Sequence, residues 1–379
     1  MKNRHLLIDC SFFHYLSLDN LSLELYTGRL LQGFRYSEVF DVTAIVWKGL
    51  ESRVDELAGY EVPKIIIDEH HIVTPWPVVD RVLGLISFTK ELRARKIDVV
   101  LMPHFYQCRL FFPKRYHQHI VVHDLITDVD LGGKMGKFKL LALKIYHWIL
   151  VHKVQHYISI SEVTRKELKH EEGVDSTVVL NSIPFDFTIQ EELVASLSGN
   201  KYILDVNRLC KSKNPCTLIL AFSLIKEKVP HLLYFKGDNY YDTTEIEELI
   251  TDLNLKDRII IDKAYRSEGE MRYLYSHADL FVSPSLKEGF GWTPIEAAIH
   301  KVPVLVSDIE VFREVTCNRL PLFDPYSPED LAEKMLKILS DPPSKEARTK
   351  LADFFQDKYS LRRQIDRLTE IFLQSLDRR

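Results

Sequence analysis

Short runs of apolar residues alternate with longer amphipathic stretches along nearly the whole chain, and this alternation restricts the possible folds more than any other feature. Several runs are apolar at consecutive positions, as expected of strands buried on both faces of a sheet. Helical patterns lie between them, one over residues 79–96 and one at the C-terminal end, where apolar residues recur at spacings of three and four. Alternating strands and helices form parallel sheets with right-handed crossovers. We therefore expect an α/β fold, with strands at residues 5–8, 42–47, 64–67, 98–102, 119–123, 156–160, 202–206, 232–236, 258–261, 280–283 and 304–307.

The alternation is interrupted once, over residues 182–200. Here Asn-Ser-Ile-Pro-Phe-Asp-Phe leads into a short acidic segment that we expect to be helical, and the strand pattern restarts at Tyr202. A chain of 379 residues is long enough for two domains. We expect two doubly wound domains of similar size, residues 1–185 and 186–357, joined by a hinge. Ligands of such sheets bind beyond the carboxyl ends of the strands, so a site is expected where two such domains face each other.

Composition excludes several classes of protein. The 50 Lys and Arg residues against 54 Asp and Glu give a net charge of −4, so overall charge does not favour nucleic acid. The five cysteines are widely spaced and form no C-x-x-C motif, which argues against a disulfide framework or a zinc site and fits a reducing cytosol. No stretch of 18 apolar residues is present, and the N-terminal apolar run is too short for a signal peptide. We expect a cytoplasmic protein that is soluble or peripheral to the inner membrane face.

Charge is nevertheless uneven along the chain. Residues 101–170 hold 11 basic and 5 acidic residues and eight of the 15 histidines. Within this stretch, the lysine-rich region 134–153 has two open interpretations. It could form an interfacial helix against anionic lipid, or a solvated basic face over a buried apolar stripe.

The most informative segment is Ser-Pro-Ser-Leu-Lys-Glu-Gly-Phe-Gly-Trp-Thr-Pro-Ile-Glu, residues 283–296. A strand should end near Ser283, and a glycine-containing loop should lead to a helix with Thr293 as N-cap and Pro294 as its first residue. Glycines let the backbone approach a ligand closely, and a helix N-terminus offers N–H groups to an anion. Glu296 could complete a T-x-x-E capping box with Thr293, or its carboxylate could accept hydroxyls of a ribose.

Two further segments carry candidate chemistry. Asp-Val-Asn-Arg-Leu-Cys-Lys-Ser-Lys-Asn-Pro, residues 205–215, places Arg208 and Lys213 just after a predicted strand. Two cations there could stabilise a diphosphate whose charge grows as a bond to it breaks. His-Ile-Val-Val-His-Asp-Leu, residues 119–125, places His123 at another strand end. Asp128 and Asp130 form a D-x-D pattern that could bind a divalent cation, although it lies far in sequence from the basic loop.

Together these segments resemble the retaining glycosyltransferases of family 4, within the glycosyl transferases group 1, which have the GT-B fold. Glu288 and Glu296 occupy the two positions of the family's E-x7-E motif. Arg208 and Lys213 match the basic pair of its G-R-L-x3-K-N loop, and His123 matches its His-Asp dipeptide. The resemblance covers about residues 101–370.

Two departures from the family pattern fall in loops that follow predicted strands. Asn207 stands where the family's basic loop has a glycine. The glycine-rich loop that the family carries after its first strand is replaced by residues 9–18, which contain no glycine. The replacement puts that loop's phosphate contact in doubt and could form a different acceptor pocket, lined by Phe12, Phe13, His14 and Tyr15.

The resemblance implies two domains with distinct tasks. The N-terminal domain, with residues 358–379 packing back on it, would bind the acceptor, and the C-terminal domain would bind a nucleotide-diphosphate sugar. Residues of the C-terminal domain would hold the parts of the donor. Arg208 and Lys213 would hold the diphosphate, Glu288 would hold the sugar, and Glu296 would hold the ribose. The amides of Gly289, Phe290, Gly291 and Trp292 would bind the phosphate and the sugar hydroxyls, and the backbone around Ala264 would bind the base. His123 would contact the sugar from the N-terminal domain.

The implied activity is transfer of a hexose with retention of configuration, without a metal or other cofactor. The donor would be GDP-mannose or a UDP-hexose, and the acceptor a glycan or lipid-linked precursor of a cell-surface polysaccharide. Two alternatives remain: a GT-B sugar-nucleotide epimerase, and a non-catalytic GT-B protein that binds a nucleotide or a partner.

Overall fold

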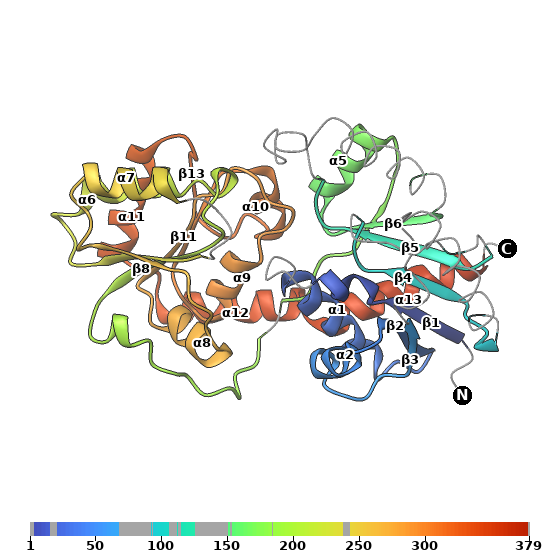
Figure 1. Cartoon of the computed structure of the whole chain (residues 1–379). Coiled ribbons are helices and arrows are strands. Elements are labelled where there is room, and N and C mark those ends of the chain that lie inside the picture. Colours follow the sequence, from blue (N-terminus) through green and yellow to red (C-terminus); the bar gives the residue numbers. More distant parts are fainter. Residues whose placement is uncertain are drawn as a thin grey trace. The chain divides into compact units, whose positions relative to one another are not determined.

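The computed structural model describes residues 4–15, 21–67, 92, 94–105, 112, 115–125, 151, 154–183, 185–237 and 243–377 (Figure 1). The chain divides into an N-terminal unit, residues 1–181 and 361–379, and a C-terminal unit, residues 182–360. The sequence placed these boundaries at 185/186 and 357/358. Most of the predicted helix at 79–96, the lysine-rich region 134–153 and the D-x-D pattern lie outside the described residues.

The N-terminal unit is built on a seven-stranded parallel sheet with the order β3-β2-β1-β4-β5-β6-β7. Its first six strands follow the order 3-2-1-4-5-6 of doubly wound dinucleotide-binding folds. Its described elements are β1 (Arg4–Asp9), α1 (Leu21–Phe34), β2 (Phe40–Trp47), α2 (Glu51–Ala58), β3 (Lys64–Ile67), β4 (Val99–Met102), β5 (His117–Val122), β6 (His156–Ser159), α5 (Glu162–Glu172), β7 (Thr177–Val178) and α13 (Leu361–Asp377), with a 3-10 helix at Ser11–Tyr15.

The C-terminal unit repeats this order in a six-stranded parallel sheet, β10-β9-β8-β11-β12-β13. Its elements are β8 (Tyr202–Val206), α6 (Pro215–Ile225), β9 (Leu232–Lys236), α7 (Thr244–Asp252), β10 (Ile259–Asp262), α8 (Glu268–Ser276), β11 (Leu280–Ser283), α9 (Trp292–Ile299), β12 (Val304–Ser307), α10 (Glu310–Val315), β13 (Leu322–Phe323), α11 (Pro328–Ser340) and α12 (Lys345–Lys358), with 3-10 turns at Ala195–Leu197 and Lys211–Lys213.

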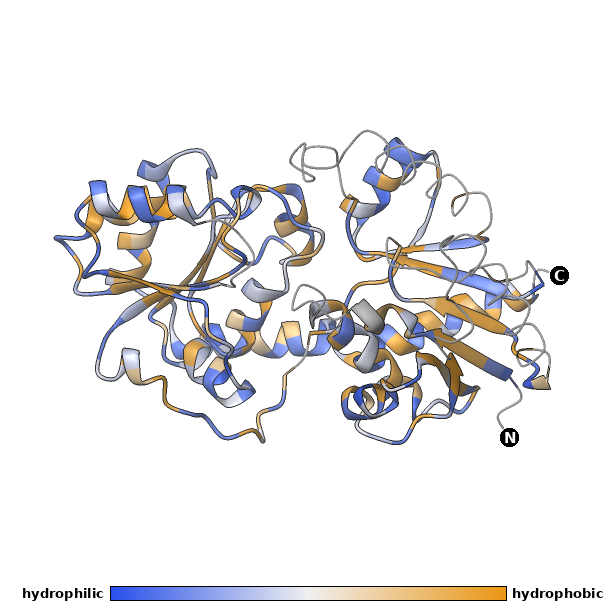
Figure 2. Cartoon of the chain, viewed as in Figure 1, coloured by the Kyte–Doolittle hydropathy of each residue, from blue (hydrophilic) through white to orange (hydrophobic). Residues whose placement is uncertain are grey.

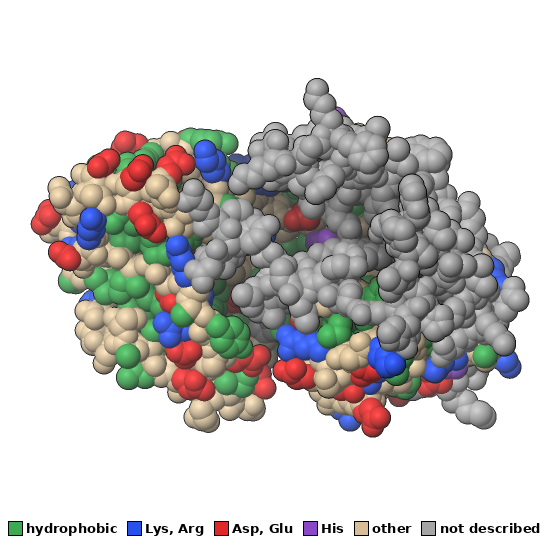
Figure 3. Space-filling model, in the orientation of Figure 1, with side chains coloured by type: hydrophobic (Ala, Val, Ile, Leu, Met, Phe, Trp, Pro, Cys, Tyr) green, Lys and Arg blue, Asp and Glu red, His purple; other side chains and the backbone are tan. Residues whose placement is uncertain are grey.

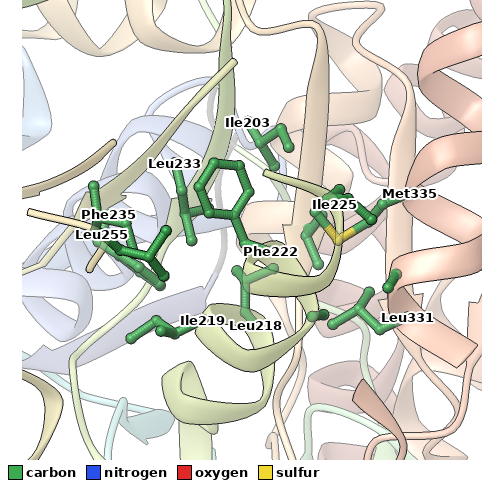
Figure 4. Packing of buried hydrophobic residues seen from close by; sticks show 14 of the residues in the cluster. Ile203, Leu218, Ile219, Phe222, Ile225, Leu233, Phe235, Leu255, Leu331 and Met335 are labelled. Atoms are coloured by element: carbon green, nitrogen blue, oxygen red, sulfur yellow. The ribbon is translucent and has the colours of Figure 1, made fainter. Parts of the chain in front are cut away.

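Burial of apolar strands against helices holds each unit together, and Figure 2 shows the hydrophobic residues concentrated on the strands of both sheets. In the C-terminal unit, Phe222 of α6 packs with Ile203 of β8 and Leu233 of β9, and Met335 of α11 joins the same cluster (Figure 4). All four side chains are about fully buried, and each such side chain contributes roughly 1.5–3 kcal/mol through burial. The surface, in contrast, carries many charged residues: acidic and basic side chains are interspersed over the face of this unit drawn in Figure 3.

The last helix, α13, follows the C-terminal unit in sequence but belongs to the N-terminal unit. Its Phe372 is fully buried and packs against Phe34 of α1, Phe40 of β2 and His119 of β5, at ring distances of 6.0, 5.9 and 4.7 Å. Gly33 of α1 lies so close to α13 that a Cβ added there would meet Ile365 at 2.4 Å. The apolar spacing of the last helix therefore serves to dock it on the N-terminal unit.

One predicted element is wrong. The acidic segment after residue 185 is irregular except for the 3-10 turn, because its polar groups bind α8 instead of forming a helix of their own. The amide of Glu192 donates to the carbonyl of Gly269, and its carboxylate accepts from Ser267. The Arg272 guanidinium donates to the carbonyl of Ile189 at 2.6 Å. These bonds fix the segment in an extended path along α8.

Candidate functional site

The two motif loops of the C-terminal unit meet at the carboxyl edge of its sheet. Strands β8 and β11 are neighbours, with Ile203 opposite Leu280 and Leu204 opposite Phe281. The strand order reverses between these two strands, and such a point is where open α/β sheets bind ligands. The loop carrying Arg208 and Lys213 leaves β8 there, and the loop carrying Glu288 leaves β11. A backbone bond from the amide of Leu286 to the carbonyl of Ser212, 2.8 Å long, joins the two loops.

Lys213 and Glu288 form an ion pair across these loops. The distance from Lys213 Nζ to Glu288 Oε1 is 2.6 Å, and the side chains are only 12% and 11% exposed. Ser285 also donates to Glu288 Oε1, at 2.8 Å. The structure thus brings together one residue from each of the two predicted motifs. Arg208 of the same loop is exposed at the surface.

Asp205, which was not singled out from the sequence, lies in β8 and interacts electrostatically with both members of this pair. It is almost fully buried. Burial raises the pKa of its carboxyl to about 7, and the Glu288 carboxylate adds to this, whereas Lys213 and the Asn207 amide act in the opposite direction. Asn207, which stands where the family has a glycine, donates to Asp205. The signal for Asp205 was a single acidic residue within an otherwise apolar strand.

The start of α9 differs from its prediction. The helix begins at Trp292 with Gly291 as N-cap, so Thr293 and Pro294 lie inside its first turn and the predicted capping box does not form. Gly291 has a φ of +83°, and a Cβ there would lie 2.4 Å from Phe312, which explains the need for glycine. The helix start is therefore fixed by this glycine rather than by a side-chain cap.

The carboxylate of Glu296 is held by tertiary structure. Tyr275 of α8 is buried and donates its hydroxyl to Glu296 Oε2 at 2.7 Å. Of the loop residues before the helix, Phe290 is buried against Tyr359 with their rings 5.5 Å apart, so its side chain belongs to the core. The backbones of Gly289, Gly291 and Trp292 remain at the edge of the sheet where the predicted site lies.

Ala264 lies in the loop after β10, on the same edge of the sheet. Its amide donates to Asp262 Oδ1 at 3.0 Å. The other oxygen of that carboxylate accepts from Arg266 and Tyr234. This network anchors the loop, and it occupies the Ala264 amide within the backbone segment that was predicted to bind the base.

His123 belongs to the N-terminal unit, where it follows β5 at the carboxyl edge. Its Nε2 is 2.9 Å from the carbonyl of Pro103, and its ring lies against those of His104, at 5.5 Å, and Tyr26, at 4.6 Å. Burial lowers the pKa of His123 below its usual value, although the Pro103 carbonyl and the Asp124 carboxylate act in the opposite direction. His104 was not identified from sequence; a histidine just after a strand was its only signal.

The glycine-free loop after β1 turns as a 3-10 helix, Ser11–Tyr15. Phe12 and Phe13 are both buried, with their rings 4.8 Å apart, so they contribute to the core instead of lining an open pocket. The side chains of His14 and Tyr15 lie outside the described residues. The loop is anchored by Trp47, whose indole donates to the carbonyl of Ser11 at 2.6 Å.

A cavity of about 460 Å³ in the N-terminal unit lies away from these residues. It is at the amino ends of the strands and is lined by residues that include His5, Arg35, Asp41, Tyr60 and Arg95. It contains no residue predicted for the site.

Among the residues that the structure describes, no group of three or more His, Cys, Asp or Glu side chains is arranged to hold a metal. No helix within the described ranges combines the length and the hydropathy needed to cross a membrane. His117 and His119 lie two positions apart on β5, and their rings stack with that of His156 at distances of 6.4 and 4.6 Å.

Comparison with known proteins supports the architecture. A glycosyltransferase from Rickettsia africae has a TM-score of 0.72 at 17% sequence identity, over 99% of both chains. HepE from Anabaena, in complex with UDP and glucose, has a TM-score of 0.69 at 13% identity, over 98% of this chain and all of that one. Two parallel sheets in this arrangement define a two-domain α/β protein of the GT-B fold.

Sequence relatives then define the activity class. The O-antigen chain mannosyltransferase RfbU of Salmonella typhimurium is 29% identical over 299 residues, 77% of this chain and 80% of that protein. Mannosylfructose-phosphate synthase of Agrobacterium fabrum is 33% identical over 147 residues, 36% of this chain and 32% of the synthase. Residues 188–353, within the C-terminal unit, match the family model described as glycosyl transferases group 1, and this match together with the mannosyltransferase relatives identifies the protein as a glycosyltransferase.

Proposed function

We propose that the protein transfers mannose from GDP-mannose to a glycan or lipid-linked acceptor, with retention of configuration and without a metal ion. The observation that carries this proposal is the Lys213–Glu288 ion pair, which joins the two motif loops at the point where the strand order reverses. The choice of mannose rests on RfbU and on the serotype-specific mannosyltransferase WbdA of Escherichia coli, which is 25% identical over 236 residues. The name of RfbU also suggests a role in O-antigen assembly.

In the proposed reaction, the bond between the anomeric carbon and the oxygen of the β-phosphate breaks. Negative charge grows on the departing diphosphate, and the Lys213 ammonium and the Arg208 guanidinium stabilise it, which is the task a metal has in other transferases. The acceptor oxygen bonds to the anomeric carbon from the same face, and its proton passes to the departing phosphate oxygen. No covalent glycosyl-enzyme is formed.

The remaining groups of the C-terminal unit orient the donor. The Glu288 carboxylate accepts hydrogen bonds from the sugar hydroxyls, and the hydrogen bond from Ser285 holds this carboxylate in place. Glu296 accepts hydroxyls of the ribose, and Tyr275 fixes that carboxylate from α8. Amides at Gly289–Trp292, at the start of α9, bind phosphate and sugar oxygens. We place the reaction in the cytoplasm or at the inner membrane face, with residues 134–153 as the lipid contact.

The first test is a thermal-shift screen of nucleoside diphosphates and sugar nucleotides, with magnesium and with EDTA. A ligand that binds only the folded protein raises its melting temperature, so a selective shift identifies the base. We expect GDP and GDP-mannose to stabilise the protein equally in both buffers and Arg208→Ala to abolish the shift. A shift that requires magnesium would contradict metal independence, and no shift with any nucleotide would favour the non-catalytic alternative.

The second test is product analysis with GDP-mannose and a simple alkyl mannoside as acceptor. NMR of the product should show the α-anomer, because the donor is an α-mannoside and configuration is retained. Lys213→Ala should lower kcat by roughly 100- to 1,000-fold, the usual effect of losing one group that stabilises transition-state charge. A β-product, or a trapped glycosylated side chain, would contradict the mechanism.

A further inference from the structure

The surroundings of His123 determine which of its nitrogens carries the proton. The carbonyl of Pro103 can only accept a hydrogen bond, so the Nε2 atom 2.9 Å away must be the donor. A neutral imidazole has one proton, so Nδ1 then keeps its lone pair. In this tautomer His123 can accept a hydrogen bond at Nδ1, whereas the charged imidazolium could only donate one.

His104 and Tyr26 hold the ring in place from two other elements. His104 follows β4, the neighbour of β5, and its ring is stacked on His123 with an interplanar angle of 20°. Tyr26 of α1 meets the same ring at 90°. Both side chains are buried, at 7% and 3% exposure. The His123 ring is thus held between two aromatic rings while its Nε2 is bound to the backbone.

Burial is the largest influence on the pKa of His123 and lowers it, and the charges around the ring modify this effect. Within the described part of the chain, the titratable groups that act on it are His104, Tyr26 and the carboxylate of Asp124, the next residue along the chain. Tyr26 is neutral, because burial raises its pKa far above its usual value. Burial also lowers the pKa of His104, and a proton on either imidazole disfavours a second proton on the other. Asp124 opposes this effect but is exposed to solvent.

We propose that His104 is a positioning residue that, together with the Pro103 carbonyl, keeps His123 neutral with Nδ1 available to accept a hydrogen bond from a substrate hydroxyl. This inference rests on the proposed function in assigning His123 to the substrate. It deepens that assignment, because it makes the recognised group a hydroxyl donor and excludes a phosphate oxygen, which has no proton to give. His104 itself need not touch the substrate.

The test is a pH titration of ¹⁵N-histidine-labelled protein by NMR without substrate, with signals assigned through His123→Asn. At pH 7 the wild type should show an unprotonated Nδ1 and a protonated Nε2 for His123, and protonation only below pH 6.5. His104→Phe keeps the stacked ring and should preserve both properties. His104→Ala admits water and should raise the pKa of His123 by roughly 0.5–1 units.

The pH profile of kcat/KM supplies the second readout. The acidic limb should move to higher pH in His104→Ala by the same amount as the NMR pKa, and it should stay in place in His104→Phe. If His104→Ala fails to fold by circular dichroism, His104→Asn takes its place. A charged His123 or the opposite tautomer at pH 7 would overturn the inference. So would an acidic limb of kcat/KM that lies at the same pH in the two His104 variants. A protein with the expected tautomer but no transferase activity would instead overturn the proposed function.

Discussion

Replacing Glu288 with glutamine should tighten the binding of a nucleoside diphosphate while it slows transfer. In the unliganded protein the ammonium of Lys213 is 2.6 Å from the Glu288 carboxylate, and both side chains are mostly buried. A bound diphosphate would have to compete with this carboxylate for the ammonium. A hydrogen bond between charged groups contributes about 1.5–3 kcal/mol, and 1.4 kcal/mol corresponds to a factor of ten. We therefore expect the Kd for GDP to fall by roughly 10- to 100-fold in Glu288→Gln.

The assay is isothermal titration calorimetry of GDP into wild type and Glu288→Gln at low and high salt. Glutamine keeps the size of the side chain and can still accept a hydrogen bond from Ser285. Glu346→Gln is the matched control, because it removes one negative charge at an exposed ion pair of α12. An unchanged or weaker affinity in Glu288→Gln would refute the reasoning, as would equal tightening in the control. In turnover with GDP-mannose, kcat should fall because the carboxylate that orients the sugar is lost.

Three further substitutions test the packing of the site and of the last helix. Tyr275→Phe removes the hydroxyl that donates to Glu296, and urea denaturation should show a free energy of unfolding lower by roughly 1.5–3 kcal/mol. Binding of GDP should weaken, whereas binding of pyrophosphate should not. Equal weakening of both would contradict the assignment of Glu296 to the ribose. Gly291→Ala should lower the free energy of unfolding by about 2–5 kcal/mol in thermal denaturation, because it causes both strain at positive φ and a clash with Phe312. Gly199→Ala, also at positive φ but with open space around it, should lower it by only about 1–2 kcal/mol. Equal losses in the two variants would argue against the clash. Phe372→Ala should destabilise the N-terminal unit by about 3–5 kcal/mol in urea denaturation, and a loss below about 1 kcal/mol would contradict the docking of α13.

Most strands could be predicted because strands buried on both faces are apolar without interruption. The segments at 64–67, 202–206, 232–236, 280–283 and 304–307 coincide with strands, and the other six differ from them by at most two residues at either end. The strands β7 and β13 were missed, since two residues are too few to form a pattern.

Local patterns failed where a tertiary contact determined the conformation. The T-x-x-E pattern predicted a capping box, but Gly291 begins the helix earlier and Tyr275 binds Glu296. The acidic segment after residue 185 had helical composition, but Arg272 and the carbonyl of Gly269 bind it along α8. In both cases the competing partner is distant in sequence, so no window of neighbouring residues contains it.

The sequence by itself determined the α/β class and the kinds of residue that follow each strand, because burial and turn chemistry act over a few neighbouring positions. Only the tertiary structure decided which of those residues meet. In the C-terminal sheet β8 lies between β9 and β11. Lys213 pairs with Glu288 because the loop that follows β8 therefore meets the loop that follows β11. His104 reaches His123 because β4 and β5 are neighbours in the other sheet. Strand order follows from the packing of whole helices on both faces of a sheet. The free energy of this packing depends on segments far apart in the chain, so no single segment contains it.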